Sequence, residues 1–492
     1  MKADYQVGII GAGFGGLGAA IQLHQAVNGS FVVFERAAEV GGTWRDNSYP
    51  GCACDVPSHL YSFSFEPNSD WSRSYSGQAE ILEYLKTCVV KNGLKEKIRF
   101  NSEVKSAQFD ENKVVWKLTD QNGYSCTVKY LISATGPLNR PNRPKFKGLE
   151  SFKGKVFHSA DWDHTYDLNG KKVAVIGTGA SAIQIVPSIA PIVSDMHVFQ
   201  RSAAWVMPRH DRYFTGLEKG LFKAIPGFRR MYREFYYWVN EFFGLQFVGS
   251  KFLNKAATVL GKKHIQRVVK DPETARKLTP DYTIGCKRIL VSDDYFPAFN
   301  RPNVHLVTDP IAEITEKGLL TASGKSIAAD ALIFSTGFIA AEVDDVALEY
   351  SFIGLNNRNL LQEWKETGPE AYKGISVSGF PNLFLLLGPN TGLGHNSVVH
   401  MMESQLNYIF DYIGHAETLK EGKFYDVKPK VQRAYNERIQ AELKHTVWAS
   451  GCKSWYVDSA GRNTTLWPKL TVSYRQETRI MDVENYDVKE NH

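Results

Sequence analysis

Short apolar runs alternate with a glycine-rich turn and a helical pattern at the start of the chain. Residues 5–10 (YQVGII) form an apolar run of strand length, and residues 11–16 (GAGFGG) form a turn in which glycine predominates. Residues 17–27 (LGAAIQLHQAV) have a helical pattern, and residues 31–35 (FVVFE) form a second apolar run. This order of strand, turn, helix and strand predicts a βαβ unit.

The same pattern occurs again near the middle of the chain. Residues 171–190 (KKVAVIGTGASAIQIVPSIA) contain an apolar run, a glycine turn and a helical pattern, and residues 196–202 (MHVFQRS) begin with another apolar run. A chain of 492 residues is long enough for two or three domains. The repeated unit therefore predicts an α/β fold with two Rossmann-like dinucleotide-binding domains.

Further apolar runs indicate how the chain passes between these domains. Residues 130–137 (YLISATGP) and 331–338 (ALIFSTGF) are predicted strands that end in a Thr-Gly step, and residues 379–392 (GFPNLFLLLGPNTG) are predicted to return to the first domain. The first domain is therefore expected to be discontinuous. The predicted boundaries are 1–140 for the first part of the first domain, 141–338 for the second domain, and 339–492 for the return to the first domain and the C-terminal region.

Residues from about 212 to 280 interrupt the α/β alternation. Residues 221–247 (LFKAIPGFRRMYREFYYWVNEFFGLQF) are dense in aromatic residues and arginines and predict a helical insertion. One interpretation is a membrane-surface or substrate-entry element, because aromatic and basic residues on one helix suit an interface. The other, which we prefer, is a helical subdomain packed on the second nucleotide domain.

The first glycine turn has the spacing of a dinucleotide-binding motif. Gly11, Gly13 and Gly16 form the pattern GxGxxG, in which the glycines permit a tight turn, a close approach to a pyrophosphate and close helix packing. Glu35 ends the second strand, 24 residues after Gly11. Its carboxylate can accept hydrogen bonds from an adenosine ribose and would repel a 2′-phosphate. The first domain is therefore predicted to bind FAD or NAD.

The second glycine turn differs from the first in charge. Gly177, Gly179 and Ala182 repeat the pattern, with alanine as the small third residue. Arg201 stands 24 residues after Gly177, and Ser202 adds a hydroxyl group. A cation at this place favours the 2′-phosphate of NADPH over NADH. One tightly bound and one exchanging nucleotide predict a flavoprotein in which FAD accepts hydride from NADPH.

Composition and charge exclude several other classes. The formal net charge is +6, and no block of lysine and arginine resembles a nucleic-acid-binding arm, so nucleic acid is not an expected partner. The longest apolar runs, such as residues 383–387, are far shorter than the roughly 20 residues of a transmembrane helix, so we expect a soluble chain without membrane association. Six scattered cysteines without a CxxC pair predict neither a disulfide framework nor a metal site, and fit a reducing cytoplasm.

Residues 152–163 (FKGKVFHSADWD) lie between the two nucleotide-binding units and show neither a helical nor a strand period. Their pattern, Phe-x-Gly-x-x-x-His-x-x-x-Trp-Asp, resembles the signature of type I Baeyer–Villiger monooxygenases. The resemblance implies an enzyme that binds FAD tightly, uses NADPH and O2, and inserts one oxygen atom beside a ketone carbonyl to give an ester or lactone. It also implies that the segment links the domains and couples their motion. The signature residues are Phe152, Gly154, His158, Trp162 and Asp163.

The stretch after the first βαβ unit is similar to the flavin-proximal stretch of the same family. Residues 41–65 (GGTWRDNSYPGCACDVPSHLYSFSF) carry this similarity. It implies cofactor contacts from Gly42, Thr43 and Trp44. It also places Asp55 at the position of the family's active-site aspartate.

Two segments in the second half of the chain extend the resemblance. Residues 286–290 (CKRIL) are similar to the family's Lys-Arg step, which implies that Lys287 lies near the NADPH phosphate and Arg288 at the catalytic position. Residues 454–456 (SWY) are similar to a C-terminal loop whose tryptophan, here Trp455, folds over the bound nicotinamide.

The implied reaction explains the catalytic residue types. Reduced FAD and O2 form a C4a-peroxyflavin whose anion attacks the carbonyl, so a fixed guanidinium can stabilise both the peroxide and the alkoxide that follows. We therefore expect Arg288 to stabilise these charges and Asp55 to orient it. Retained NADP⁺ would protect the intermediate from water.

Other classes remain as alternatives. A heteroatom-oxidising flavin-containing monooxygenase, which makes N- or S-oxygenated products, shares both domains but usually lacks the Trp-Asp end of the signature. A disulfide-type pyridine-nucleotide reductase would carry a CxxxxC pair near the first unit, which the sequence lacks. A flavin-binding redox sensor without turnover would not need Arg288 and Asp55. Which ketone is oxidised, whether sulfides are also oxidised, and the oligomeric state stay open.

Overall fold

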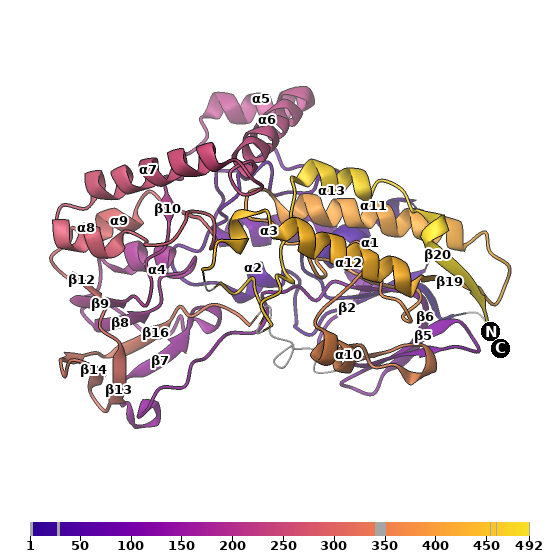
Figure 1. Ribbon diagram of the computed structural model, residues 1–492, viewed down its shortest axis with the longest axis horizontal. Coiled ribbons are helices and arrows are strands. Elements are labelled where there is room, and N and C mark those ends of the chain that lie inside the picture. The colour runs from indigo at the N-terminus through magenta and orange to yellow at the C-terminus, as the bar shows by residue number, and fades with distance from the viewer. Residues whose placement is uncertain (1–2, 27–29, 340–350, 453, 459, 492) are drawn as a thin grey trace.

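Two α/β regions lie side by side in the computed structural model, which describes residues 3–26, 30–339, 351–452, 454–458 and 460–491. In Figure 1 the first region, with β2, β5 and β6, lies on the right, and the second, with β8, β9 and β16, lies on the left. Helices α5, α6 and α7 lie along the top. The expected start of the return to the first domain, residues 340–350, is outside the described residues.

The first region is built on a mixed sheet of strand order β17-β4-β5-β6-β1-β2-β3, with β18 also paired to β6. The central strand β1 is parallel to both β2 and β6, as a βαβ unit requires. The strands are β1 (Tyr5–Ile10), β2 (Phe31–Phe34), β3 (Ile98–Arg99), β4 (Val104–Asp110), β5 (Val115–Asp120), β6 (Ser125–Ser133), β17 (Phe352–Ile353) and β18 (Leu383–Leu385). Because β17 and β18 come from the last third of the chain, this region is discontinuous in sequence.

Helices cover this sheet and close its core. Helix α1 (Phe14–Ala26) contacts both α3 (Gln78–Lys91) and α11 (Val398–Ala416). A Cβ atom at Gly18 would lie 3.0 Å from the ring of Phe63, so the helix approaches its neighbours closely. The remaining helices and strands of this region are α2 (Thr43–Asp46), α10 (Leu360–Thr367), α12 (Pro429–Leu443), α13 (Thr471–Glu477) and the antiparallel pair β19 (Lys423–Val427) and β20 (Tyr486–Glu490).

The second region is built on a fully parallel sheet of strand order β12-β9-β8-β16-β7. Its strands are β7 (Lys155–His158), β8 (Lys172–Ile176), β9 (Asp195–Phe199), β12 (Val304–Val307) and β16 (Ala331–Phe334). Helix α4 (Ala182–Ile189) follows the second glycine turn. An antiparallel sheet of β13 (Ile311–Thr315), β14 (Gly318–Thr321) and β15 (Ser326–Ala328) belongs to the same region, and its apolar residues join one core with those of β8 and β16.

Residues 152–163 contain the strand β7, although their sequence shows no strand period. Phe157 and His158 are successive strand residues that point to opposite faces of the sheet, and both are buried. A strand covered on both faces lacks the alternation of apolar and polar positions by which a strand is recognised.

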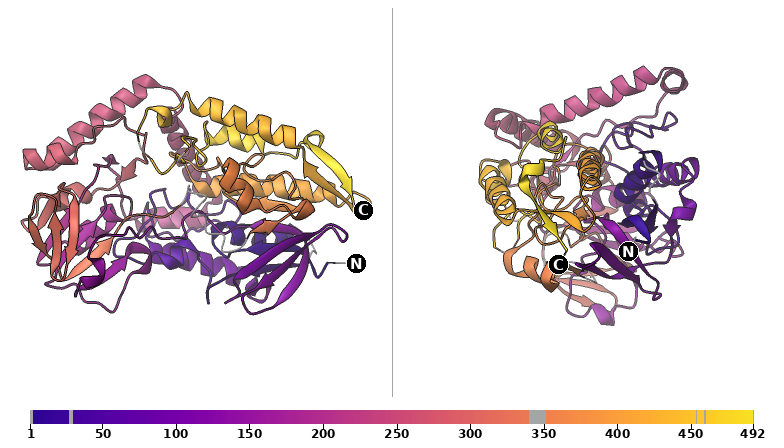
Figure 2. Two further views of the ribbon diagram at one scale, coloured as in Figure 1. Left: turned by 60° about the horizontal axis from the view of Figure 1, so that its bottom comes forward. Right: turned by 90° about the vertical axis from the view of Figure 1, so that its right-hand side faces the viewer.

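The segment expected as a helical insertion forms four helices. They are α5 (Gly216–Ala224), α6 (Pro226–Gly244), α7 (Lys251–Val268) and α8 (Pro272–Leu278). In the right-hand view of Figure 2, pink helices of this segment lie at the top of the molecule. The short strands β10 (Val206–Met207) and β11 (Leu290–Val291) pair before and after them, and α9 (Tyr295–Ala298) follows. Short 3₁₀ helices cover residues 95–97, 149–151, 159–161, 355–357, 447–449 and 483–485. Within the described ranges, we find no helix with the length and apolar character needed to cross a bilayer.

Candidate active site

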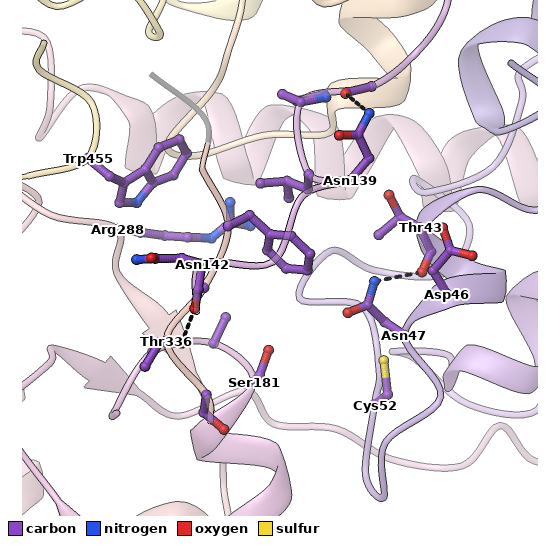
Figure 3. A pocket seen from close by; sticks show the side chains of 18 of the residues that line it. Thr43, Asp46, Asn47, Cys52, Asn139, Asn142, Ser181, Arg288, Thr336 and Trp455 are labelled. Atoms are coloured by element: carbon purple, nitrogen blue, oxygen red, sulfur yellow. Dashed lines mark hydrogen bonds between the residues drawn. The ribbon is translucent and has the colours of Figure 1, made fainter. Parts of the chain in front are cut away.

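A cavity of about 1170 Å³ lies between the two regions, and Figure 3 shows part of it. Its lining includes both glycine turns, both Thr-Gly steps, the segment at Arg288 and the loop at Trp455. The volume exceeds the roughly 300–1,000 Å³ of a typical small-molecule pocket. A space of this size, between two nucleotide-type folds, can hold more than one ligand.

The first glycine turn has the close contacts that its motif predicts. Gly11 has φ +100°, and a Cβ atom there would lie 2.6 Å from the carbonyl oxygen of Ala134. A Cβ atom at Gly16 would lie 1.8 Å from the carbonyl oxygen of Gly11. Gly13 lines the cavity, and a Cβ atom there would meet only Gly42, at 3.7 Å. Gly11 and Gly16 thus serve the fold, and Gly13 leaves main chain open to the cavity.

Glu35 lies at the end of β2 and lines the cavity, although only 4% of its surface is exposed. One carboxylate oxygen accepts a hydrogen bond from the Ala12 N–H at 2.9 Å, and the other accepts from the Ala37 N–H at 2.9 Å and from Arg45 at 2.8 Å. Sequence analysis missed Arg45, although it lies in the quoted stretch 41–65. Two carboxylate oxygens offer about four acceptor sites. Glu35 therefore keeps capacity to accept from a ribose hydroxyl.

The predicted cofactor residues Gly42, Thr43 and Trp44 all line the cavity. Gly42 has φ +51°, and helix α2 begins directly after it. The buried Trp44 donates from its indole N–H to the Tyr61 hydroxyl oxygen at 3.2 Å. This bond fixes the ring at the wall of the cavity.

The second glycine turn repeats the first in detail. Gly177 has φ +114°, and a Cβ atom there would lie 2.4 Å from the carbonyl oxygen of Ser335. A Cβ atom at Gly179, which lines the cavity, would meet nothing within 4 Å. Helix α4 begins at Ala182. Ser335 precedes the second Thr-Gly step as Ala134 precedes the first, so each step supports the first glycine of one turn.

Two cations and a hydroxyl group gather beyond the second turn. Arg201, Ser202 and Lys287 line the cavity, and the Lys287 ammonium donates to the Ser202 hydroxyl oxygen at 3.2 Å. Burial and the nearby Arg201 charge lower the pKa of Lys287 from its ordinary value. The Lys287 ammonium also lies 4.6 Å from the ring centre of Tyr282. Two neighbouring cations beside a hydroxyl group form a site suited to a phosphate dianion.

Arg288 and Asp55 are 233 positions apart in the sequence and meet at the cavity. The Arg288 Nε–H donates to Asp55 Oδ2 at 3.2 Å, and its Nη2 group forms an ion pair with the same oxygen. Both residues line the cavity, where 37% of the Arg288 side chain and 31% of the Asp55 side chain are exposed. The Asp55 charge raises the pKa of Arg288 above its ordinary value. The pair thus presents a permanent, oriented cation to the cavity.

The C-terminal loop reaches the same cavity. Ser454 and Trp455 line it, and the ring centre of Trp455 lies 4.5 Å from that of Tyr456. Tyr456 is buried, and burial raises its pKa to about 12, so its phenol stays neutral. The charge of Arg288, a neighbour that sequence analysis did not anticipate, partly offsets this rise in the pKa of Tyr456.

A disulfide joins Cys286 to Cys452, with the two Cα atoms 6.2 Å apart. The sequence predicted no disulfide framework and did not anticipate this bond. The two residues are 166 positions apart, and only the fold brings them together. The bond ties the segment before Lys287 to the loop before Trp455. The expected reducing cytoplasm loses the support that scattered cysteines gave it.

The signature residues lie outside the cavity lining. A Cβ atom at Gly154 would lie 2.4 Å from the carbonyl oxygen of Asp330. His158 is fully buried, its Nδ1 accepts from the Ala160 N–H at 3.0 Å, and burial lowers its pKa to about 4. Phe152 is likewise buried. These contacts fit structural roles.

The end of the signature is held by two local contacts. The ring of Trp162 lies edge-on to Phe157, with centroids 4.7 Å apart. Asp163 pairs with Lys155 at 2.5 Å, and hydrogen bonds from Lys155 and Thr165 hold the pKa of Asp163 well below its usual value. The signature thus folds back on its own strand β7.

One group of possible metal ligands occurs among the described residues, away from this cavity. Asp195, His197 and His305 bring their ligand atoms within 4.8 Å of one another. His305 Nε2 lies 2.9 Å from Asp195 Oδ1. This contact between neighbouring strands explains why the side chains lie close together without a metal ion. None of the three lines the cavity.

Comparisons with known proteins agree with this geometry. A flavin-binding monooxygenase-like family matches residues 4–221. The chain is 48% identical over 486 residues to a Baeyer–Villiger monooxygenase of Streptomyces coelicolor, covering 98% of this chain and 92% of that protein. It is 46% identical over 483 residues to a Baeyer–Villiger monooxygenase of Pseudomonas aeruginosa, covering 98% and 91%. The crystal structure of OTEMO in complex with FAD and NADP has a TM-score of 0.88, at 28% identity and 99% and 100% coverage.

The fold and the cavity thus define a flavoprotein monooxygenase with two dinucleotide-binding domains. Within that class, the chain belongs to the Baeyer–Villiger monooxygenase family. The resemblance found in the sequence, the predicted fold class and the predicted enzyme class are confirmed.

Proposed function

We propose that the chain uses FAD, NADPH and O2 to insert an oxygen atom beside the carbonyl of a ketone, with Arg288 as the catalytic cation and Asp55 as the residue that positions it. The observation that carries this proposal is the Arg288–Asp55 ion pair at the wall of a cavity shared by two nucleotide-type turns. Relatives of the same family at 46–48% identity support the reaction, and OTEMO, crystallised with FAD and NADP, supports the cofactors.

The first glycine turn fits FAD. Gly13 opens main chain to the cavity next to Gly42, so a pyrophosphate can approach both without meeting a side chain. Glu35 would hold the ribose of the adenosine. Thr43 and Trp44 would form the wall on the flavin side, where Trp44 is fixed by its hydrogen bond to Tyr61.

The second glycine turn fits NADPH. Gly179 is open to the cavity, and Arg201, Ser202 and Lys287 would hold the 2′-phosphate. Two neighbouring cations repel each other, and a bound dianion offsets this repulsion. The pair therefore binds a dianion more strongly than a neutral group. This arrangement favours NADPH over NADH.

When bound and reduced by NADPH, FAD supplies the activation of O2. Arg288 would stabilise negative charge on the attacking oxygen and on the carbonyl oxygen during attack. Two N–H groups of the Arg288 guanidinium donate to Asp55, which fixes the orientation of the guanidinium. The cation therefore does not have to move as negative charge develops on the reacting oxygen atoms. The phenol of Tyr456, a neighbour of Arg288, stays protonated and neutral.

Trp455 would restrict the access of water to the reacting atoms from the C-terminal side. It lies in the cavity lining with Arg288, and the disulfide at Cys452 holds its loop near the second region. Exclusion of water favours oxygen transfer over the release of hydrogen peroxide.

A substrate panel of linear, cyclic and aryl ketones together with sulfides tests this function. The purified protein with FAD should consume NADPH and form esters or lactones, identified by the added mass of one oxygen atom from ¹⁸O2. Sulfoxides formed in addition would extend the substrate range. Formation of sulfoxides with no ester or lactone from any ketone would instead identify a heteroatom-oxidising monooxygenase.

A further inference from the structure

The helical insertion carries most of the exposed large apolar side chains of the molecule. Sixteen such side chains are exposed in the described part of the chain, and eleven of them lie between Tyr213 and Leu260. That segment is about a tenth of the sequence. Contiguous apolar surface of this kind marks an interaction site in a folded protein, whereas scattered single residues do not.

Helix α6 presents these side chains as one stripe. Met231, Phe235, Trp238 and Phe242 follow one another at steps of four, three and four residues, and each is 56–61% exposed. At 3.6 residues per turn this spacing places all four on one side of the helix. Phe252 on the following helix α7 is exposed as well. We call Met231, Phe235, Trp238 and Phe242 the apolar stripe.

The opposite side of α6 is firmly attached to the rest of the protein. Buried Glu241 accepts hydrogen bonds from the Asn396 amide at 2.8 Å, from His395 at 3.2 Å and from the Thr471 N–H at 3.2 Å. Arg233 donates to three main-chain carbonyl oxygens of the first region, at 2.8–3.2 Å. The inner side of α6 therefore packs on the first region, so the preferred interpretation, packing on the second nucleotide domain, was wrong for this helix. Helix α7 does contact β10 and α9 of the second region. The apolar stripe is exposed on a helix whose orientation is fixed.

The segment that carries the stripe also has a large net positive charge. Residues 212–268 contain eleven lysines and arginines and three acidic residues, a net charge of +8, whereas the whole chain has a net charge of +6. The remainder of the chain is therefore slightly acidic. Among the described residues, only Arg212 and Arg233 of these eleven form an ion pair. The other nine basic side chains of this segment form no ion pair with the described residues.

We propose that the apolar stripe and the basic residues around it bind the surface of an anionic phospholipid bilayer. An amphipathic helix with aromatic residues on one side and lysine and arginine beside them lies in the bilayer interface, with its apolar side at the acyl boundary. Anionic headgroups attract the basic residues. In Figure 1 α5 and α6 form the top of the molecule, beyond both sheets, so a bilayer can reach them without contact with the sheets.

Charge excludes a second copy of the chain as the preferred occupant. A two-fold interface would bring the same patch from each copy together, and with it a net charge of +8 against +8. Such repulsion opposes association. An anionic bilayer has the opposite sign and is the complementary partner. The earlier expectation of no membrane association was drawn from the lack of a transmembrane run, which does not bear on an interfacial helix.

Vesicle flotation with the full-length, FAD-loaded protein tests this surface. The protein should float with vesicles that contain about 30% phosphatidylglycerol in phosphatidylcholine, and should bind pure phosphatidylcholine at least about tenfold more weakly. Raising the salt from roughly 0.1 M to 1 M shortens the Debye length from about 10 Å to 3 Å, so the bound fraction should fall.

Two pairs of variants separate the stripe from general surface effects. Phe235→Ser with Trp238→Ser should abolish flotation while NADPH oxidation in solution persists. The matched control is Val90→Ser with Ile480→Ser, which removes two exposed apolar side chains outside the insertion and should float as the wild type does. Lys255→Glu with Lys262→Glu should weaken binding to anionic vesicles and leave the weak binding to neutral ones unchanged.

Three results would overturn the proposal. The first is equal recovery of the wild type with and without anionic vesicles. The second is unchanged flotation of the Phe235→Ser, Trp238→Ser variant. The third is a wild-type dimer in light scattering that this variant converts to a monomer, with no vesicle binding by either protein, which would make the stripe a self-interface. None of these results depends on whether ketones are oxidised, so they leave the proposed function unaffected.

Discussion

The two nucleotide-binding turns share one backbone arrangement and differ in what surrounds it. Gly11 and Gly177 have φ +100° and +114°, and each is supported by a carbonyl oxygen that precedes a Thr-Gly step. At the corresponding strand ends, Glu35 is buried and accepts three hydrogen bonds, whereas Arg201 is exposed. The same turn thus ends in a closed, pre-ordered site in one region and an open site in the other.

This difference explains how one chain can retain one nucleotide and exchange another. Groups that the protein has already ordered cost no further entropy on binding, so the first site suits a cofactor that stays bound. An exposed cationic site that gains its partner only on binding suits a nucleotide that enters and leaves at each turnover. The structure therefore supports FAD as the resident group and NADPH as the exchanging one.

The strongest test of this comparison is a valine at the open glycine of each turn. Gly13→Val should abolish FAD binding, because a Cβ atom there meets only Gly42 at 3.7 Å and the added methyl groups enter the space for the pyrophosphate. Gly179→Val should keep FAD and lose NADPH binding for the same reason. Flavin absorbance of the purified proteins and NADPH titration measure both.

A suitable control for these variants is Gly414→Val, on an exposed turn of α11 where an added Cβ meets nothing within 4 Å. It should retain both ligands. Stoichiometric flavin in Gly13→Val would contradict the assignment of the first site.

The second test concerns the residue pair that joins the two regions. Arg288→Ala should keep FAD and continue to oxidise NADPH, whereas oxygen insertion should fall by a factor of about 10² or more, the usual effect of losing one preorganised stabiliser of charge. NADPH consumption should then yield hydrogen peroxide. Arg288→Lys should restore little, because an ammonium cannot reproduce the two-donor contact with Asp55.

Product analysis and a peroxide assay, run beside stopped-flow spectra, measure this split. Lys287→Ala, assayed at saturating NADPH, is the control, because it should weaken NADPH binding but keep the wild-type yield of ester per NADPH consumed. Wild-type yields of ester from Arg288→Ala would show that the stabilising cation lies elsewhere, with Lys287 as the next residue to examine.

The third test removes the positive charge at the second strand end. Arg201→Ala should weaken NADPH binding roughly tenfold to a hundredfold, since a charge-assisted phosphate contact is worth about 1.5–3 kcal/mol. The affinity for NADH should change little, because it lacks the 2′-phosphate. The KM values for both nucleotides measure the effect. An equal loss for both would remove Arg201 from the phosphate site.

The smallest expected effect on catalysis concerns the disulfide that ties the regions together at the cavity. Cys452→Ser should lower the free energy of unfolding by about 2–4 kcal/mol, as for disulfides that close long loops. It should also raise the share of NADPH that ends as hydrogen peroxide by a few-fold, because the loop of Trp455 is no longer held at Cys286. Cys126→Ser, at a buried free cysteine of β6, controls for the loss of a thiol.

Thermal unfolding and peroxide yield measure these two consequences. Dithiothreitol should reproduce the effect of Cys452→Ser in the wild type and add nothing in the variant. Unchanged coupling in both cases would show that the loop keeps its place without the disulfide.

Local sequence was sufficient for the two βαβ units. The apolar runs and the glycines at Gly11 and Gly177 act over a few residues, and a strand of fixed rise places Glu35 and Arg201 at corresponding ends. The family resemblance then assigned Asp55 and Arg288 their roles. The strand β7 escaped recognition because it is buried on both faces and has no alternating pattern.

Only the tertiary structure decided which distant groups meet. It brought Arg288 to Asp55 across 233 positions and Cys286 to Cys452 across 166, and chain spacing encodes neither distance. It also determined which side of α6 is covered. A helical period shows that an apolar side exists, but whether another element packs against that side depends on the packing of the whole chain.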